Sequence, residues 1–173
     1  MTSYKKYELS RMFDEETADK MLRWRNSDSV RKYCRQLDFI TPADHCHYMN
    51  RMEIDSSQRM YVLNYNGTAI GICGFTSIDT TARRAEFSFY IAPEFQRRGH
   101  SVPGLTLLFD HGFDVLNLNR IWGEVFSFNH AANIFEKIGM EKEGVRKDFY
   151  FKNGRYVDAT LYSIGAEKWR GLR

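Results

Sequence analysis

The chain has 173 residues, which is enough for one domain, residues 1–173, with a normal hydrophobic core. Its net charge is only +3, and lysine and arginine are spread along the chain, which argues against a nucleic-acid-binding protein. A mean hydropathy of −0.53, 43% hydrophobic residues and no apolar run near the roughly 20 residues of a membrane span argue against a membrane protein.

The cysteines and the N-terminal residues predict a cytoplasmic protein. Cys34, Cys46 and Cys73 are odd in number and contain no C-x-x-C pair, so a disulfide framework is not expected. The first ten residues lack the apolar core of a signal peptide. His45-Cys46-His47 predicts no metal site, because residues two apart on a helix do not face each other.

The first quarter of the chain predicts three helices. The first opens at Phe13-Asp14, and residues 26–28 interrupt the helical period, which resumes as a second short helix through Leu37. Thr41-Pro42-Ala43-Asp44 resembles a capping box with proline at the first helical position, and it predicts a third helix through about Ile54.

A change to a period of two predicts strands in the following segment. Residues 59–65 and 68–78 form two strands joined by Asn66-Gly67, a strong two-residue hairpin signal. Residues 83–91 add a third strand. A helix over 101–116, a strand over 120–128, a helix over 131–138 and a last hairpin with Asn153-Gly154 at its turn complete a mixed α/β chain.

The segment 85–116 predicts an anion site. Alternation in the strand places Phe87, Phe89 and Ile91 on one face and Glu86, Ser88 and Tyr90 on the other, and Pro93 ends the strand. The loop 96–101 then leads into the helix. At a helix start the backbone N–H groups lack intrahelical partners and the dipole is positive, so a loop of this kind can hold a pyrophosphate.

The ordered set of these segments resembles the GCN5-related N-acetyltransferase superfamily. The resemblance also rests on the run from Asn129 to Met140, on Glu143-Gly144 and on the run from Gly154 to Asp158, and it covers nearly the whole chain. It implies a mostly antiparallel, mixed central sheet with splayed fourth and fifth strands, flanked by helices. It also implies acetyl-CoA as the acetyl donor.

The resemblance assigns the donor-binding residues by position. Ile91 would stand where the pantetheine arm meets the fourth strand, as an added strand would. The loop residues Gln96, Arg97, Arg98, Gly99, His100 and Ser101 would hold the pyrophosphate, and Asn129 would meet the pantetheine arm. The chain departs from the family pattern in Ser101, in Pro103, which removes an N–H, and in a segment from Asn129 to Gly139 that is one residue short.

The family pattern also leaves the proton transfers to be assigned. Phe135 stands where many relatives carry a tyrosine that protonates the leaving thiolate, and phenylalanine cannot do this; water or another hydroxyl would have to substitute. Glu86 is the first candidate for the general base, with Glu124 in reserve. The alternative for Glu86 is a surface glutamate paired with Arg83 or Arg84.

The acceptor is expected to be a primary amine of a small molecule, but the sequence supports three classes. The N-terminal half resembles acetyltransferases of nucleotide-linked amino sugars, which implies an acceptor pocket lined by Arg25, His45, Thr81 and Tyr90. The second half looks like spermidine acetyltransferases and, more loosely, like ribosomal-protein N-terminal acetyltransferases. Because the N-terminal helices carry arginines, we rank the anionic acceptor first.

One alternative of a different class follows from the departures named above. With Ser101, Pro103 and Phe135 the chain would also fit a non-catalytic acetyl-CoA-binding module. The resemblance leaves a homodimer open, and neither a nucleic acid nor a membrane is expected as a partner.

Overall fold

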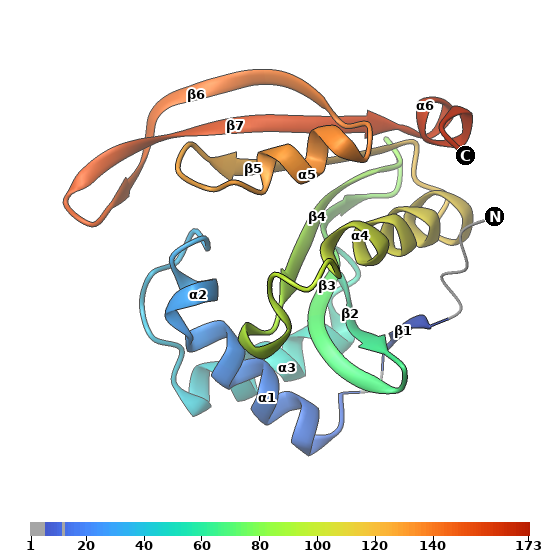
Figure 1. Ribbon diagram of the computed structural model, residues 1–173. Helices are drawn as coiled ribbons and strands as arrows, with labels where there is room; N and C mark the ends of the chain where they lie inside the picture. Colours follow the sequence, from blue (N-terminus) through green and yellow to red (C-terminus); the bar gives the residue numbers. More distant parts are fainter. Residues whose placement is uncertain (1–5, 12) are drawn as a thin grey trace.

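A computed structural model describes residues 6–11 and 13–173. The first five of the ten N-terminal residues that were inspected for a signal peptide therefore lie outside the described residues. Seven strands form one sheet in the order β1-β2-β3-β4-β5-β7-β6 (Figure 1). All neighbouring pairs are antiparallel except β4 with β5, which is parallel. The strands are β1 Tyr7–Ser10, β2 Arg59–Tyr65, β3 Thr68–Asp79, β4 Arg84–Ile91, β5 Arg120–Phe126, β6 Glu141–Lys152 and β7 Arg155–Gly165.

Both predicted hairpins are confirmed, and for the expected reason. Asn66 and Gly67 join β2 to β3 with φ of 50° and 76°, and Asn153 and Gly154 join β6 to β7 with φ of 51° and 80°. Two consecutive residues with positive φ give the turn whose twist matches that of the flanking strands, and Asn-Gly tolerates it best. The edge strand β1 had no counterpart among the predicted elements.

The helices are α1 Glu15–Asn26, α2 Asp28–Arg31, α3 Pro42–Ile54, α4 Ser101–Asp110, α5 Ala132–Lys137 and α6 Ala166–Gly171. Asp14 caps α1 by accepting from the Thr17 N–H, and Thr41 and Asp44 form the predicted capping box of α3. The predicted helix over 101–116 is α4 followed by a π-helical stretch, His111–Val115. The helix α6 was not predicted.

The second helix is much shorter than predicted. It ends at Arg31 instead of continuing to Leu37, and residues 32–41 form an irregular segment. Hydrogen bonds from two side chains hold this segment instead. The Lys152 ammonium of β6 donates to the carbonyl oxygens of Cys34 and Arg35, and the Arg31 side chain donates to the carbonyl of Leu37. These carbonyls are therefore satisfied without a helix.

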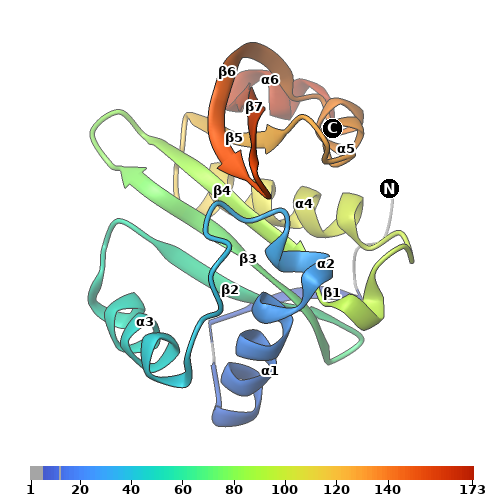
Figure 2. The same cartoon turned by 90° about the vertical axis from the view of Figure 1, so that its left-hand side faces the viewer.

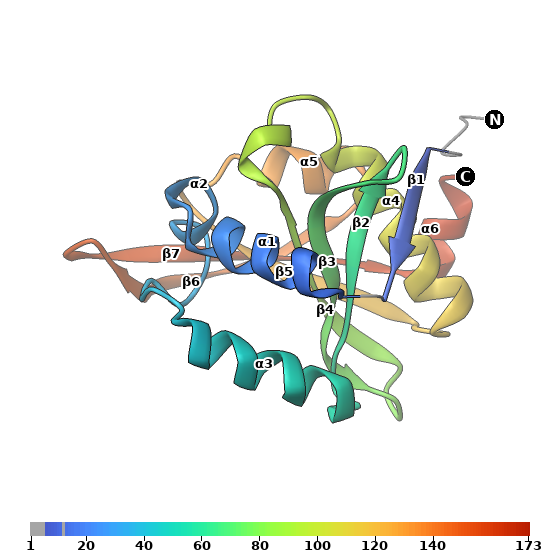
Figure 3. The ribbon, with the colours of Figure 1, turned by 90° about the horizontal axis from the view of Figure 1, so that it is seen from below.

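The helices cover both faces of the sheet (Figures 2 and 3). Phe87, Phe89 and Ile91 belong to the core on the side of α4, α5 and α6, whereas Tyr90 packs with α1 and α3, as the strand alternation predicts. The contact with α4 is close: a Cβ on Gly104 would lie 2.7 Å from Leu63 and 3.0 Å from Phe89. None of the described helices is long and apolar enough to cross a membrane.

The parallel pairing of β4 with β5 stops after three residue pairs, the last of which joins Glu86 to Trp122. From Phe87 to Ile91, β4 has no described partner strand on that side, while β5 continues beside β7 as far as Phe126. The two strands therefore splay, as the family resemblance implies. This opening positions the site.

Candidate active site

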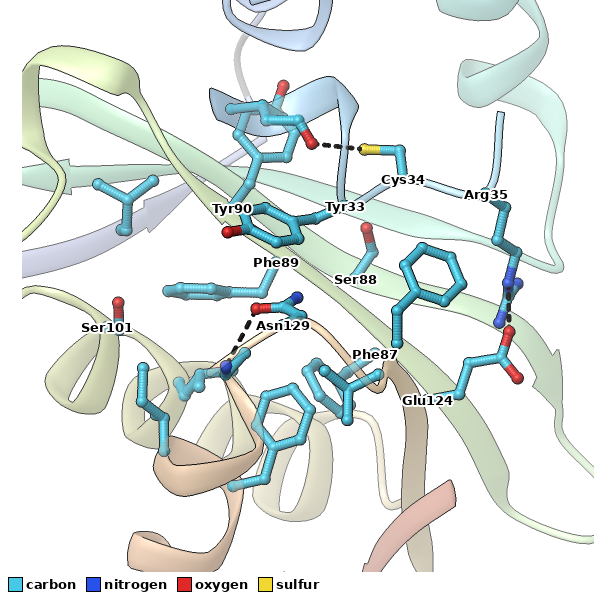
Figure 4. A pocket seen from close by; sticks show the side chains of 18 of the residues that line it. Tyr33, Cys34, Arg35, Phe87, Ser88, Phe89, Tyr90, Ser101, Glu124 and Asn129 are labelled. Atoms are coloured by element: carbon cyan, nitrogen blue, oxygen red, sulfur yellow. Dashed lines mark hydrogen bonds and ion pairs between the residues drawn. The ribbon is translucent and has the colours of Figure 1, made fainter. Parts of the chain in front are cut away.

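A cavity of about 620 Å³ lies where β4 and β5 diverge. This volume is within the usual range of pockets for small molecules and cofactors. Its wall comes from the irregular segment after α2, from the splayed strands, from the start of α4 and from α5 (Figure 4). It is lined by nine of the predicted site residues: Arg25, Glu86, Tyr90, Ile91, Gln96, Ser101, Glu124, Asn129 and Phe135.

One end of the cavity offers backbone groups. The Gln96 Nε2 amide donates to the Ile91 carbonyl at 3.0 Å, which joins the end of β4 to the loop 96–101. Ser101 begins α4, and no described side chain caps that helix. The N–H groups of Ser101 and Val102 precede the first intrahelical bond, which Gly104 donates to His100, so they remain available to an anion.

The loop 96–101 is shaped by two residues with positive φ, Arg97 at 61° and Gly99 at 83°. A Cβ on Gly99 would meet no described atom within 4 Å, so the glycine is required by the backbone conformation and not by neighbouring protein. The Arg98 guanidinium lies over the Phe95 ring, 5.5 Å from its centroid.

His100 faces away from the mouth of the loop. Its Nδ1 lies 2.9 Å from the Tyr7 hydroxyl, and its ring packs against Tyr65. Desolvation, together with the charge of Arg98, lowers the pKa of this imidazole. His100 therefore contributes its backbone to the loop, while its side chain ties the loop to the edge strand β1.

Asn129 and Phe135 form another part of the wall. The Asn129 Oδ1 accepts the N–H of Ala131 at 3.0 Å, which orients the amide so that its Nδ2 has no hydrogen-bond partner among the described residues. Phe135 is buried between Phe87 and Tyr162, with ring centroids 5.1 Å and 5.7 Å away. It can close the cavity but cannot donate a proton.

Two carboxylates and an arginine gather beside the last parallel residue pair. Glu86 is 7% exposed, and both of its oxygens receive hydrogen bonds from the Arg35 guanidinium, from Nη1 at 3.2 Å and from Nη2. The Arg35 Nε donates to the Glu124 Oε1 at 2.7 Å (Figure 4). Burial opposes the charge of Arg35, but the two carboxylates outweigh it and raise the pKa of the guanidinium.

This geometry excludes the alternative reading of Glu86 as a surface glutamate. Arg84 pairs instead with Asp79 at 3.4 Å, and the Arg83 Nε donates to the carbonyl of Asn117 at 2.9 Å. Glu86 is paired instead with Arg35, 51 positions earlier in the chain.

Glu124 is held from the other side by the long hairpin of β6 and β7. Arg146 donates to its Oε2 at 3.1 Å, and the Tyr150 hydroxyl donates to its Oε1. Desolvation and the hydrogen bond to Glu124 raise the pKa of Tyr150. Both oxygens of Glu124 are thus occupied by contacts within the protein.

The predicted acceptor residues are separated by the fold. Arg25 lines the cavity and has no hydrogen bond or ion pair with any described residue. Tyr90 also lines the cavity, but its hydroxyl is buried without a hydrogen-bond partner among the described residues, and desolvation raises its pKa.

The structure does not bring His45 or Thr81 to the cavity. The His45 Nε2 is engaged with the carbonyl of Ala18 at 2.9 Å, which ties α3 to α1. Thr81 is exposed in the turn between β3 and β4, at the end of β4 where β5 is still paired and the strands have not yet diverged.

Sequence reasoning missed Arg35 and Tyr33, which both line the cavity. Tyr33 extends into it with its ring stacked on Phe128, 5.9 Å between centroids (Figure 4). The helical period of residues 30–37 made Tyr33 look like part of an apolar helix face. Arg35 carried no local signal, because its partners lie 51 and 89 positions away.

Comparison with known proteins identifies a family. The family model described as "Acetyltransferase (GNAT) domain" matches residues 9–141. The crystal structure of spermidine N-acetyltransferase from Vibrio cholerae in complex with CoA and spermine superposes with a TM-score of 0.90 at 25% identity, over 96% of this chain and 99% of that one. Another structure of that enzyme, with a TM-score of 0.81 at 25% identity over 95% and 96% of the two chains, is described as dodecameric.

Two curated relatives illustrate the range of acceptors. The chain is 36% identical to spermidine N(1)-acetyltransferase of Escherichia coli K12 over 64% of this chain and 60% of that one. It is 30% identical to the "Putative ribosomal N-acetyltransferase YdaF" of Bacillus subtilis over 63% and 60%. Among the curated relatives that match with the highest significance, the aligned part spans 54–60% of their length.

Proposed function

The chain belongs to the GNAT acetyltransferase family, and from that premise we propose that it is an acetyl-CoA-dependent N-acetyltransferase whose acceptor is a small polyamine of the spermidine type. The observation that carries the proposal is the splay of β4 from β5, which joins a donor site made of backbone groups to a pair of carboxylates in one cavity.

The donor end fits an acyl-CoA. A pantetheine arm carries amides that can pair with the unpartnered backbone of β4 between Phe87 and Ile91, as an added strand does. The uncapped start of α4, with Gly99 in the preceding loop, suits the pyrophosphate. Arg97 and Arg98 add positive charge there, and the free Nδ2 of Asn129 would donate to the arm.

The acceptor end supports the proton transfer that amide formation requires. A primary ammonium has a pKa of about 10 and must lose a proton before its nitrogen can attack the thioester carbonyl. The nitrogen then forms the new C–N bond, the C–S bond breaks, and the CoA thiolate leaves. We assign the role of base to Glu86, directly or through one water, with Glu124 as the neighbouring carboxylate.

The departing thiolate has no tyrosine at position 135 to protonate it. The hydroxyl of Tyr33 is the strongest substitute on the cavity wall, since Phe135 carries no proton and the Tyr90 hydroxyl is buried under the helices. A thiol with a pKa of about 8.5 leaves readily as its thiolate close to neutral pH, so this step needs less assistance than deprotonation of the amine.

Two lines of support favour the polyamine over the nucleotide-linked amino sugar that we ranked first from the sequence. Spermidine acetyltransferases are among both the curated relatives and the solved structures that match this chain. In addition, His45, one of the residues on which the amino-sugar interpretation rested, is engaged with Ala18.

An anionic amine remains the second candidate because of Arg25. This guanidinium lines the cavity and has no ion-pair partner among the described residues, which suits an acceptor carboxylate or phosphate. A change of Arg25 to alanine should raise the KM of an anionic acceptor and leave the KM of spermidine little changed.

The test is release of the CoA thiol from acetyl-CoA in the presence of spermidine, spermine, amino sugars, nucleotide-linked amino sugars and N-terminal peptides. The proposal expects turnover with polyamines at a kcat/KM well above the other classes. Turnover with the nucleotide sugars alone would transfer the assignment to the second candidate. Tight binding of acetyl-CoA without turnover on any amine would indicate a non-catalytic binding module.

A further inference from the structure

The two carboxylates of the cavity are paired with cations of the protein itself, Glu86 with Arg35 and Glu124 with Arg35 and Arg146. The Arg35 guanidinium contacts both oxygens of Glu86 and one oxygen of Glu124. Glu86 and Glu124 side chains are 9% and 4% exposed, whereas that of Arg35 is 48% exposed. The carboxylates are therefore fixed in the wall, and the guanidinium is the partner that can leave toward solvent.

The backbone of Arg35 is anchored independently of its side chain. The Lys152 ammonium donates to the carbonyl oxygens of Cys34 and Arg35, which holds the irregular segment against the tip of the β6–β7 hairpin. Besides Glu86 and Glu124, the Arg35 side chain also interacts with the Tyr150 hydroxyl, and all of these partners are side chains. Rotation of this side chain into water would leave the backbone of the segment in place.

A guanidinium and a primary ammonium present the same chemistry to these carboxylates, a positive charge with several N–H donors. We propose that Arg35 is a specificity-determining residue that occupies the position of the acceptor ammonium, and that a cationic acceptor must displace it to reach Glu86. This inference rests on the proposed function, since it concerns the acceptor of that same cavity.

Displacement would couple acceptor binding to the proton transfer. While Arg35 is bound, both oxygens of Glu86 are occupied, so this carboxylate is not available as a base. When an ammonium replaces the guanidinium, one oxygen faces the proton that must leave. Selectivity follows as well: only an acceptor cation that competes with an intramolecular guanidinium gains access, whereas a neutral amide or alcohol does not.

The direct test uses methylguanidinium as the probe, in the full chain saturated with CoA. Binding is followed by NMR titration in the unchanged protein, in Arg35→Gln and in Arg35→Lys. Arg120→Gln is the matched control, since Arg120 pairs with Glu143 on the surface at the start of β5. We expect Arg35→Gln to bind methylguanidinium about tenfold more tightly than the unchanged protein, Arg35→Lys to fall between them, and Arg120→Gln to match the unchanged protein.

Kinetics give a second readout with the best polyamine acceptor. The KM of the amine should fall about tenfold in Arg35→Gln, and added methylguanidinium should inhibit this variant competitively with the amine. A rise of that KM would instead mean that Arg35 recruits the acceptor, which would overturn the proposal. Equal binding of methylguanidinium to all four proteins would overturn it too.

The two arms separate this inference from the proposed function. If no amine is acetylated, the proposed function fails, yet the titration with methylguanidinium still decides whether Arg35 fills a displaceable cation position. If polyamines are acetylated and Arg35→Gln changes neither KM nor binding of the probe, the proposed function stands and the role of Arg35 is refuted.

Discussion

Exchanging Lys152 for methionine removes the ammonium that anchors the segment carrying Arg35, while keeping a side chain of similar length. Lys152 is 2% exposed, its Nζ donates to the carbonyl of Cys34 and lies 3.4 Å from that of Arg35, and it is 4.3 Å from the centroid of the Phe126 ring. Methionine keeps the apolar contact with Phe126 but leaves both carbonyl oxygens without this donor.

The size of the effect can be estimated from these contacts. A hydrogen bond from a charged donor contributes about 1.5–3 kcal/mol, and the cation–π contact about 1 kcal/mol. Burial of an ammonium costs free energy that a thioether does not, which offsets about 1–2 kcal/mol. We therefore expect the free energy of unfolding to fall by about 2 kcal/mol, which corresponds to about 4–8 °C in Tm for a chain of this size.

Thermal unfolding and amide hydrogen exchange check this expectation together. Exchange at Tyr33 and Cys34, whose N–H groups donate to the carbonyls of Val30 and Arg31, should accelerate in Lys152→Met, because the segment loses its tie to the hairpin. Lys147→Met, on the same strand with an exposed ion pair to Asp158, is the control and should change Tm little. A Lys152→Met protein with the Tm and the exchange rates of the unchanged protein would refute the anchoring argument.

Three further predictions concern the donor, the base and the pH dependence of stability. Gly99→Glu should abolish acetyl-CoA binding in calorimetry with circular dichroism unchanged, because the side chain enters the space of the pyrophosphate; unchanged affinity would remove the loop from the site. Activity should rise toward alkaline pH and then level off. Glu86→Gln should lower kcat and move the rising limb of this profile to higher pH. Phe135→Tyr should raise kcat modestly if protonation of the thiolate limits the rate. An unaltered pH profile in Glu86→Gln, under conditions where chemistry limits turnover, would reassign the base to Glu124 or solvent. Burial lowers the pKa of His111, whose Nε2 contacts the Tyr61 hydroxyl at 2.8 Å. The unfolded chain therefore binds more protons than the folded one, and Tm should fall as the pH drops below about 6.5. His111→Gln should make this fall shallower, and an equal dependence of Tm on pH in both proteins would contradict the prediction.

Local signals in the sequence predicted most elements because their causes are local. Asn66-Gly67 and Asn153-Gly154 specify their turns through their own φ angles, and Thr41 and Asp44 cap a helix that they themselves begin. The loop 96–101 was recognisable for the same reason. Its function depends on the order of strand, loop and helix along the chain, which the sequence displays directly.

The elements that sequence reasoning missed depend on distant partners. The helix predicted through Leu37 ends at Arg31, and the irregular segment that follows is held by Lys152, which lies 118 positions after Cys34. Arg35 meets Glu86 and Glu124 only in the folded chain, since they lie 51 and 89 positions away. His45 shows the converse: the resemblance placed it in the acceptor pocket, but its ring contacts the carbonyl of Ala18.

The early end of the β4–β5 pairing has a consequence for how sequences of this family can diverge. A donor held by the main chain of residues 87–91 would be indifferent to most side chains on that stretch, so substitution there leaves its contacts in place. Among ordinary substitutions only proline removes an N–H outright. Enzymes with about one residue in four in common can therefore retain one acyl donor while the side chains across the cavity change the amine that each one accepts.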